Sequence, residues 1–548
     1  MSIQKNNLLI AEQLRLLADL ETLDGNPWPA NAYKKAAEIV RSLDVPIDTI
    51  GDLKSFGGIG ESISKKIIEI LKTGTCKKLE SLKVQYKSAL EARKLLVVPG
   101  VGMKTAIKLY NDGITTVQEL SDACDAGKVT AKSIKQGVKL ALKTQGRIPI
   151  YDVLPVVESI LDDLRSMDGV HRISFAGSVR RGRETVKDVD ILIVANDPDA
   201  IFDRFLQYGE ELIRGDQKAR IIAPINDRTS IQVDLLFTTK QSWPFALAYF
   251  TGSKEHNIAI RRLALDKGYS LNEHGFSDKI TGLRHSVSDG ILFEEQIYDF
   301  LGIPWCPPEL REGSDLLEEI PDLVTLDDIQ ADWHTHTTYS SDARNSVYEM
   351  AASAKNHGLK ILGITDHVEV QYRWMPEDID KRVKEARQAE EILGIKIYTG
   401  AEVGVNNDGS LEDRIDLDKQ DYLIASIHKS HDKHPVKRLL VAIEDPRIKM
   451  IGHPTGRIIG RRDIPDEDWE VLFKRCAELG VLVEINSPRL DLPVAYIKMA
   501  KKCGCKFVIN SDSHAVEHFI WLRYGVSLAR RAGLTKFDLA TPLEIDRT

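Results

Sequence analysis

The chain has 548 residues, 43% of them hydrophobic and 28% charged, and a formal net charge of −8. This length predicts three to four domains at roughly 100–200 residues each, and the composition is that of an ordinary globular protein. Because no apolar run approaches the length of a membrane span, the sequence excludes a protein anchored by apolar helices.

The N-terminal stretch MSIQKNNLLIAEQLRLL predicts an amphipathic helix. It differs from a signal peptide because it lacks a basic start, a continuous apolar core and a small-residue cleavage site. The six cysteines form no CxxC pair, which is typical of a reducing compartment. We therefore expect a cytoplasmic protein.

Positive charge is concentrated in one segment. Residues 51–150 carry 18 Lys and Arg against 9 Asp and Glu, so this segment has a net charge of +9 and the rest of the chain −17. Such an asymmetry indicates contact with nucleic acid in one part of the chain. The alternative is a solvated, lysine-rich helix face.

Two similar glycine turns accompany this charge. FGGIGESISKKIIEIL (56–71) and VVPGVGMKTAIKLYNDG (97–113) each place glycines before apolar residues at helical spacing. This is the helix-hairpin-helix pattern, in which backbone N–H groups at a helix start bind a DNA phosphate without reading the base sequence. Core packing between ordinary helices is the alternative. The candidate DNA-binding residues are Gly58, Gly60, Gly100, Gly102 and Lys104.

The stretch GSVRRGRETVKDVDILIV (177–194) combines two kinds of ligand. Its last residues alternate and then become continuously apolar, which predicts a strand that enters a buried sheet. Period two places Asp188 and Asp190 on one face, where paired carboxylates favour a divalent cation such as Mg²⁺. Upstream, a helix that starts near Gly177 would bind phosphates with its N–H groups. The side chains available for the same phosphates are Ser178, Arg180 and Arg181.

A second acidic strand follows. SIQVDLLF (230–237) carries Asp234 among apolar residues. If this strand pairs with the first, three carboxylates converge, which is enough for two cations about 3.5–4 Å apart that act on a hydroxyl and a nucleoside triphosphate. The alternatives are an Asp-x-Asp in a surface turn and a carboxylate at a strand end. Beyond it, YFTG (249–252) predicts a turn, and the next helix presents Asn257 and Arg261 on one side.

Taken in this order, both hairpins, GSVRRG, DVD, YFTGS and SLNEHGF resemble the family X DNA polymerases over a little more than half of the chain. The resemblance implies a multidomain α/β and α+β architecture. Its parts would be an N-terminal helical, lyase-like domain (1–85), a helical DNA-binding subdomain (86–147), a nucleotidyltransferase palm (148–240) and a nucleotide-selecting subdomain (241–312).

The resemblance also implies roles for individual residues. The residues implied to bind two Mg²⁺ ions, and to act in catalysis, are Asp188, Asp190 and Asp234. Those implied to contact the nucleotide, from its triphosphate through its sugar to the new base pair, are Gly177, Ser178, Arg181, Tyr249, Phe250, Gly252, Asn257 and Arg261. Lys66 stands where the family has a lysine that forms a Schiff base with the sugar of an abasic site. A lysine that only binds a 5′-phosphate is the alternative.

After a predicted acidic linker (313–330), seven apolar strands end in polar ligands and are followed by helices. Such alternation predicts a parallel barrel with its active site at the C-terminal ends of the strands. Imidazoles and carboxylates together suit Zn²⁺, Mn²⁺ or Fe. The polar residues at these positions are His334, His336, Asp366, His367, Glu402, His428, His453, Glu484, Asn486, Asp512 and His514.

HxH, TDH, GAE, SIH, GHP and SDSH, in this order, resemble the polymerase and histidinol phosphatase (PHP) domain, a distorted seven-stranded (βα) barrel that binds up to three metal ions. The resemblance assigns residues 331–548 to this domain. Asp366, Glu484 and Arg457 would support the ligands, bind phosphate or be structural. The implied metal ligands are His334, His336, Asp342, His367, Glu402, His428, His453, Asp512 and His514.

Both halves together resemble bacterial and archaeal family X polymerases with a C-terminal PHP domain. This implies a DNA repair enzyme, acting in base excision repair, that fills short gaps with dNTPs. Its barrel would act as a 3′–5′ exonuclease, with 3′-phosphatase or abasic-site endonuclease activity. The expected partners are gapped or primer–template duplex DNA, without membrane contact, and the expected state is a monomer. The alternatives are a DNA-binding scaffold with an inactive barrel and a nucleotidyltransferase that acts on a small molecule or RNA.

Overall fold

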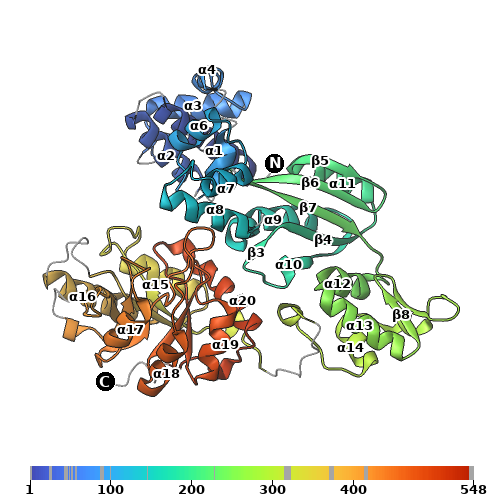
Figure 1. The fold of residues 1–548 in the computed structure, drawn as a ribbon. Coiled ribbons are helices and arrows are strands. Elements are labelled where there is room, and N and C mark those ends of the chain that lie inside the picture. The colour runs from blue at the N-terminus through green and yellow to red at the C-terminus, as the bar shows by residue number, and fades with distance from the viewer. Residues whose placement is uncertain are drawn as a thin grey trace. The chain divides into compact units, whose positions relative to one another are not determined.

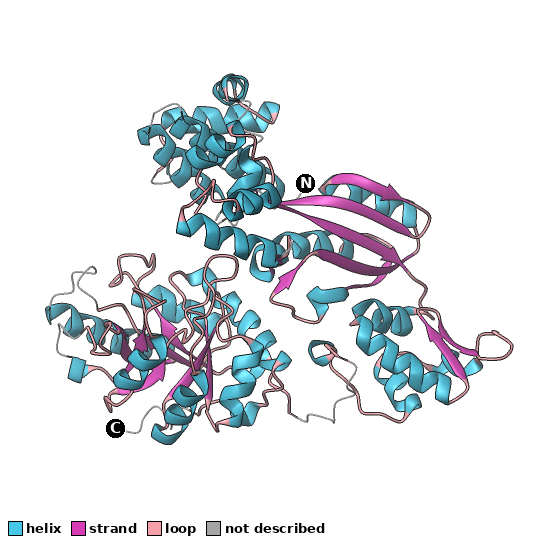
Figure 2. Cartoon of the chain, in the orientation of Figure 1, coloured by secondary structure: helices cyan, strands magenta, loops and turns pink. Residues whose placement is uncertain are grey.

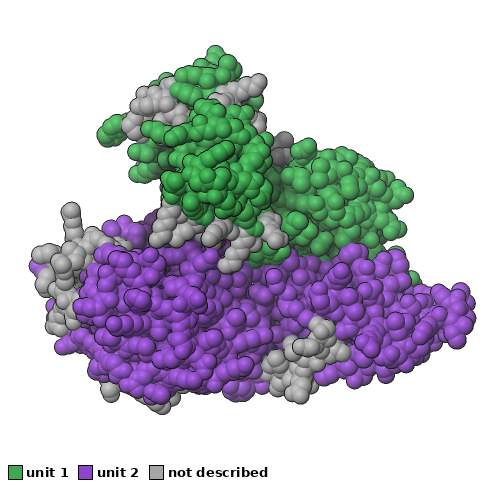
Figure 3. Space-filling view, viewed as in Figure 1, with its two compact units in different colours: residues 1–176, 185–246 green, residues 177–184, 247–548 purple. Residues whose placement is uncertain are grey.

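The computed structural model (Figure 1) combines helices and strands (Figure 2). It describes residues 3–541 except 24–26, 42–46, 48–49, 51–52, 56–57, 87–91, 99, 145, 227–228, 314–321, 369–375 and 413–416, so residues 314–321 of the predicted linker lie outside the described residues. The chain divides into two compact units, residues 1–176 with 185–246 and residues 177–184 with 247–548 (Figure 3). The loop 177–184 therefore belongs to the same unit as the C-terminal half of the chain.

The N-terminal part of the first unit is helical, as the two hairpins predict. One apolar core forms around Leu14, Ile63 and Ile67, and a second forms around Leu109 and Leu120. The first core contains the first hairpin and the second core the second hairpin. The elements are α1 (Ile3–Leu23), α2 (Pro27–Arg41), η2 (Leu53–Ser55), α3 (Glu61–Thr73), α4 (Lys77–Gln85), η3 (Arg93–Val97), α6 (Met103–Asn111), α7 (Val117–Asp125) and α8 (Lys132–Thr144).

A mixed sheet forms the rest of the first unit. The described strands follow the order β2-β4-β7-β6-β5, in which β4 and β7 are parallel and the other neighbours antiparallel. Residues 191–194 of β4 are buried, as their apolar run predicts. The elements are β1 (Ile148–Pro149), α9 (Ile150–Arg165), β2 (Val170–Phe175), β3 (Thr185–Val186), β4 (Asp188–Ala195), α11 (Pro198–Phe205), β5 (Glu210–Arg214), β6 (Lys218–Asn226) and β7 (Thr229–Phe237).

The second unit includes a small α+β region that precedes the barrel. Its core contains a buried salt bridge, in which Arg311 Nη1 lies 3.0 Å from Glu294 Oε1. The Arg311 guanidinium also stacks on Trp305, 4.6 Å from the ring centroid. The elements of this region are α10 (Gly177–Arg180), α12 (Trp243–Thr251), α13 (Lys254–Asp266), β8 (Tyr269–Asn272), β9 (Gly275–Asp278) and α14 (Glu295–Leu301).

The C-terminal part is a parallel barrel, which confirms the predicted fold. Among the described residues, seven strands pair in chain order, and a parallel bridge from Thr335 to Ser513 joins the first strand to the segment after the last. The strands are β10 (Ala331–Thr335), β11 (Ile361–Ile364), β12 (Lys396–Gly404), β13 (Tyr422–Ser426), β14 (Ile448–Ile451), β15 (Leu482–Asn486) and β16 (Phe507–Asn510). The helices are α15 (Val347–Asn356), α16 (Pro376–Leu393), α17 (Pro435–Ala442), α18 (Trp469–Leu479), α19 (Val494–Lys502) and α20 (Leu522–Arg531).

No helix in the described ranges is both long and apolar enough to cross a membrane.

Helix α16 of the barrel is attached to the strands by a buried charged residue, Arg382. Arg382 Nη1 donates to Asp366 Oδ2 at 3.1 Å, and Nη2 donates to the Gly400 carbonyl at 2.7 Å. Asp366 also accepts hydrogen bonds from Thr337 and Ser340, so it has a structural role at the end of β11.

We expect Asp366→Asn to lower the free energy of unfolding by about 3–5 kcal/mol, because it leaves the Arg382 guanidinium buried without its carboxylate partner. Urea denaturation of the full chain measures this change. The matched control is Arg475→Gln, which breaks an exposed pair with Glu444 and should leave the midpoint unchanged. Equal midpoints for both variants would contradict a structural role for the buried pair.

Candidate active sites

The three predicted palm carboxylates lie on two neighbouring strands. The parallel register of β4 and β7 places Asp190 opposite Asp234 and Asp188 opposite Gln232. Asp188 and Asp190 are two residues apart and therefore share a face of the sheet with Asp234. The register thus brings all three carboxylates to one face of the sheet, at the start of β4 and in the second half of β7.

Asp234 has cationic partners that the sequence analysis missed. Arg220, opposite it on β6, donates from Nε to Oδ1 at 2.6 Å and from Nη2 to Oδ2 at 2.8 Å, and Lys218 Nζ lies 2.7 Å from Oδ2. Burial raises the pKa of Asp234, but these charged hydrogen bonds outweigh burial and keep its pKa below the usual value. Asp234 raises the pKa of Arg220, and Asp188 and Asp190 raise it further. Arg220 is therefore the counter-charge of the carboxylate group.

The loop 177–184, predicted to bind phosphates, forms α10 and a turn. Gly177 has a positive φ of 57°, which favours glycine at this position. Ser178 Oγ is buried and donates no hydrogen bond to any residue in the described ranges. Arg181 approaches Gly252 so closely that a Cβ at that glycine would lie 3.1 Å from Nη1. Ser178 is thus a buried donor with capacity to bind a phosphate oxygen.

The arginines of the loop bind protein oxygens in this structure. Arg180 Nη1 donates to Thr251 Oγ1 at 2.7 Å and to Glu294 Oε1 at 3.0 Å. Arg181 donates from Nε to Glu312 Oε1 at 3.0 Å and from Nη1 to the Thr251 carbonyl. A phosphate would therefore have to compete with Glu312 for Arg181.

The predicted sugar and base-pair residues lie together at the junction of α12 and α13. The rings of Tyr249 and Phe250 meet edge to face, with centroids 5.3 Å apart. Asn257 Nδ2 donates to the Tyr249 carbonyl at 2.7 Å, and Arg261 Nε donates to the Asn257 carbonyl at 3.2 Å. The structure therefore links the two helices through the same residues that the sequence singled out.

The two glycine hairpins have the same backbone geometry. Gly58 and Gly100 have positive φ values of 121° and 86°. Gly60 and Gly102 are extended N-caps of α3 and α6, and no side chain caps either helix. A Cβ at Gly60 or Gly102 would meet no atom within 4 Å among the described residues, and Lys104 is exposed nearby in sequence. Both helix starts therefore present open N–H groups of the kind that bind phosphate.

Lys66 lies on α3, which the first hairpin precedes. Its Nζ donates to Ser62 Oγ at 2.9 Å and lies 5.6 Å from the centroid of the Tyr33 ring. Ser62, Tyr33, Lys54 and the hairpin glycines line a groove of about 620 Å³. Lys66 thus contacts two residues of this groove.

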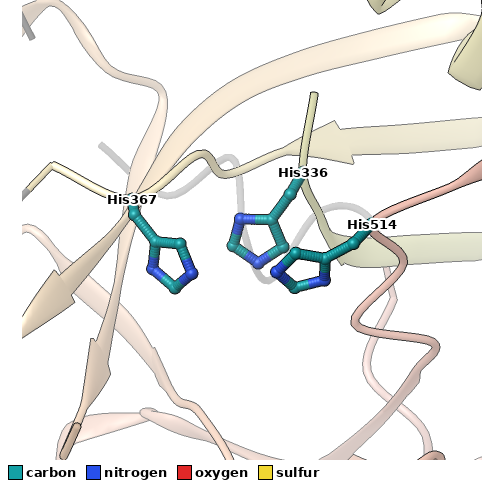
Figure 4. A group of neighbouring side chains, drawn as sticks. All are labelled: His336, His367 and His514. Atoms are coloured by element: carbon teal, nitrogen blue, oxygen red, sulfur yellow. The ribbon is translucent and has the colours of Figure 1, made fainter. Parts of the chain in front are cut away.

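The barrel histidines converge at the C-terminal ends of the strands. Figure 4 shows His336, His367 and His514 side by side. The ring centroids of His336 and His367 are 4.4 Å apart, and those of His336 and His514 are 4.1 Å apart. Asp342, which follows β10 in a loop, has Oδ2 3.6 Å from both His367 Nε2 and His514 Nε2. The structure therefore brings Asp342 into the predicted ligand group.

Glu402 lies at the centre of the group and is 1% exposed. Its Oε2 is 3.3 Å from His334 Nε2 and 3.0 Å from His367 Nδ1, while its Oε1 is 3.1 Å from His428 Nε2 and 2.9 Å from His453 Nε2. Burial disfavours its charge, yet His428 and the other imidazoles hold its pKa well below the usual value. A carboxylate surrounded by imidazoles is the mixed ligand set that would hold Zn²⁺, Mn²⁺ or Fe.

The donor atoms fit a metal centre. His334 Nε2 and His336 Nε2 are buried and make no hydrogen bond within the described part of the chain, yet they lie 3.7 and 3.3 Å from Asp512 Oδ1. Ligands about 2.1 Å from a shared ion lie about 3.0–3.6 Å from each other. Burial lowers the pKa of His336 to about 3, so its imidazole is neutral, the form that binds metals.

Buried side chains behind the ligands orient them. Glu484 Oε1 lies 2.7 Å from His334 Nδ1 and accepts a hydrogen bond from Asn510 Nδ2 at 2.9 Å. Asn486 Nδ2 donates to Asp512 Oδ2 at 3.1 Å. Glu484 therefore turns His334 Nε2 toward Glu402, the orientation that second carboxylates give to histidine ligands in metal sites.

Two arginines border the cluster. Arg489 Nε lies 3.5 Å from Asp512 Oδ2. The sequence analysis missed Arg489, although it follows β15 as the other candidates follow their strands. Arg457, for which that analysis left phosphate binding and a structural role open, instead donates from Nη1 to Glu184 Oε2 at 2.9 Å.

Comparison of the amino-acid sequence with known proteins identifies DNA polymerases as relatives of this chain. The chain is 32% identical over 538 residues, 93% of each chain, to the DNA polymerase/3′-5′ exonuclease PolX of Bacillus subtilis (strain 168). This chain belongs to the PolX family. Over about half of its length it is also similar to DNA polymerase lambda of Rattus norvegicus, at 26% identity and 56% of each chain. The enzyme of the same name from Arabidopsis thaliana is 28% identical over 51% of this chain and 57% of its own.

Family models match successive parts of this PolX-family chain. A helix-hairpin-helix domain matches residues 5–76, and a SAM-like helix-hairpin-helix tandem matches 92–136. A DNA polymerase beta thumb matches 246–312, and a PHP domain matches 332–487. These matches confirm that the resemblance to family X polymerases with a PHP domain extends over both halves.

We expect Glu402→Gln to remove most of the metal that the PolX-family chain retains, because the central carboxylate loses the charge that balances the bound cations. Metal content after Mn²⁺ loading and gel filtration, measured by mass spectrometry, tests this. The control is Glu444→Gln on the exposed face of the barrel. Metal retention equal to that of the control would contradict the assignment of Glu402.

Proposed function

We propose that this PolX-family chain extends primer ends into short gaps in DNA with dNTPs and trims 3′ ends with its PHP barrel, as a monomeric repair enzyme. The observation that carries the proposal is that one chain of this family holds two separate ligand groups. One consists of three carboxylates on adjacent palm strands, and the other surrounds Glu402 in the barrel.

In the palm, Asp188, Asp190 and Asp234 would hold Mg²⁺, which when bound lowers the pKa of the primer 3′-hydroxyl and neutralises the triphosphate. Asp234, as the carboxylate held by Arg220, is kept ionised and oriented before substrate arrives. Ser178 would donate its buried hydroxyl to a phosphate oxygen.

In the barrel, the buried imidazoles and Glu402 would hold Mn²⁺, Zn²⁺ or Fe, which when bound would supply a hydroxide nucleophile and stabilise negative charge on the phosphate oxygens. Glu484 keeps His334 in the tautomer that leaves Nε2 free to bind. Arg489, whose Nε lies 3.5 Å from Asp512 Oδ2, would bind an oxygen of the scissile phosphate. The same chemistry would remove a 3′-phosphate or cut beside an abasic site.

We expect Asp188→Ala with Asp190→Ala to abolish primer extension and to spare 3′ cleavage, because only the palm loses its metal ligands. His334→Ala with His336→Ala should do the reverse. Extension and degradation of a one-nucleotide-gapped duplex, compared in Mg²⁺ and Mn²⁺, measure both activities. If either double variant lost both activities while still folded, two independent sites would be excluded.

Duplex DNA is the substrate class that the N-terminal helices support. Both hairpins present uncapped helix starts within a segment of net charge +9, which suits phosphates of a duplex backbone. A nucleotidyltransferase for small molecules would not need two such turns. A scaffold with an inactive barrel would not need a buried carboxylate whose two oxygens both face imidazoles.

A 5′-end lyase activity is a second candidate, favoured by the contact of Lys66 with the groove residues Ser62 and Tyr33. We expect borohydride to trap the chain on 5′-deoxyribose-phosphate DNA and expect Lys66→Ala to abolish the adduct. Lys65→Ala is the matched control, because Lys65 pairs with Glu61 on the exposed side of α3. Trapping that survives in Lys66→Ala would assign Lys66 to 5′-phosphate binding.

A further inference from the structure

The phosphate-binding loop 177–184 is held by the barrel at its C-terminal end. Glu184 Oε2 lies 2.9 Å from Arg457 Nη1, and Glu184 Oε1 lies 3.8 Å from Arg531 Nη1. The three side chains are only 20%, 14% and 10% exposed. Because water is largely excluded, these ion pairs are less screened than pairs on an open surface.

Helix α20 makes further contacts with the same loop. Ser527 Oγ donates to the Gly182 carbonyl at 3.3 Å, and a Cβ at Gly182 would lie only 2.0 Å from that hydroxyl. Arg530 Nε donates to Glu309 Oε1 at 2.7 Å, in the segment that also contains Glu312. The glycine therefore allows the loop to lie directly on the barrel helix.

Arg457 connects the loop to the rim of the barrel. It follows β14, four residues after His453, and its Nη2 donates to the Leu490 carbonyl. In the same rim, Thr455 Oγ1 donates to Asp491 Oδ1 at 2.6 Å. The partner of Glu184 thus belongs to the loops that follow β14 and β15.

We propose that Glu184 is a positioning residue, and that the PHP barrel, through Arg457 and Arg531, sets the conformation of the loop that binds the nucleotide triphosphate. This inference rests on the proposed polymerase function. The ion pairs of Glu184 with Arg457 and Arg531 hold residues 177–184 without contacting the palm carboxylates. We therefore expect their loss to weaken nucleotide binding more than it slows the chemical step.

The test is single-dNTP insertion on a one-nucleotide-gapped duplex whose primer ends in a phosphorothioate linkage, which blocks 3′ removal. Wild type is compared with Glu184→Gln, Arg457→Gln and the double variant. We expect each single variant to raise the KM for dNTP about fivefold to tenfold, with kcat within about twofold, since a tenfold change corresponds to one modest interaction. The double variant should be no worse than Glu184→Gln alone, because Glu184→Gln already removes the contact with Arg457.

Arg475→Gln is the matched control, since Arg475 binds Glu444 on the barrel without contacting the loop. Circular dichroism and the thermal unfolding midpoint verify that the variants are folded. An unchanged KM for dNTP, a fall in kcat alone, or multiplicative effects in the double variant would contradict the proposal that Glu184 positions the loop. Absence of extension by wild type would instead overturn the proposed function.

Discussion

Both candidate sites depend on one electrostatic constraint, which is that carboxylates gathered at the edge of parallel strands need positive charge beside them. In the palm, Arg220 and Lys218 supply that charge to Asp234. In the barrel, imidazoles surround the buried Glu402. Burial makes an uncompensated charge costly, and the chain folds with cationic or imidazole partners at the buried carboxylates Asp234 and Glu402.

The constraint also explains the different character of the two groups. The palm carboxylates have permanently charged partners, and a bound cation would have to share Asp234 with them. The barrel carboxylates have titratable partners, and burial keeps His336 and His453 neutral. In His334, burial lowers the pKa but Glu484 and the neighbouring carboxylates outweigh burial and raise it. The barrel group therefore combines neutral imidazole donors with a charged one, whereas the partners in the palm are a guanidinium and an ammonium group.

The loop 177–184 carries charged side chains of both signs. Its arginines bind Glu294 and Glu312, and its glutamate binds two arginines of the barrel. The opposite charges along the loop thus find their partners in different parts of one compact unit. A PHP domain in this arrangement is a structural support for a neighbouring loop as well as a site of its own chemistry.

The sequence by itself determined the strands, the hairpins and the barrel, because period-two and helical spacing, glycine turns and ligands after strands are local features. It also singled out the histidines, since each follows or ends a recognisable strand. Only the tertiary structure decided the partners of those residues. Arg220 contacts Asp234 through strand register, Glu484 reaches His334 across 150 positions, and Arg457 binds Glu184 across 273 positions. Such pairings depend on register and domain packing, and no local pattern encodes them.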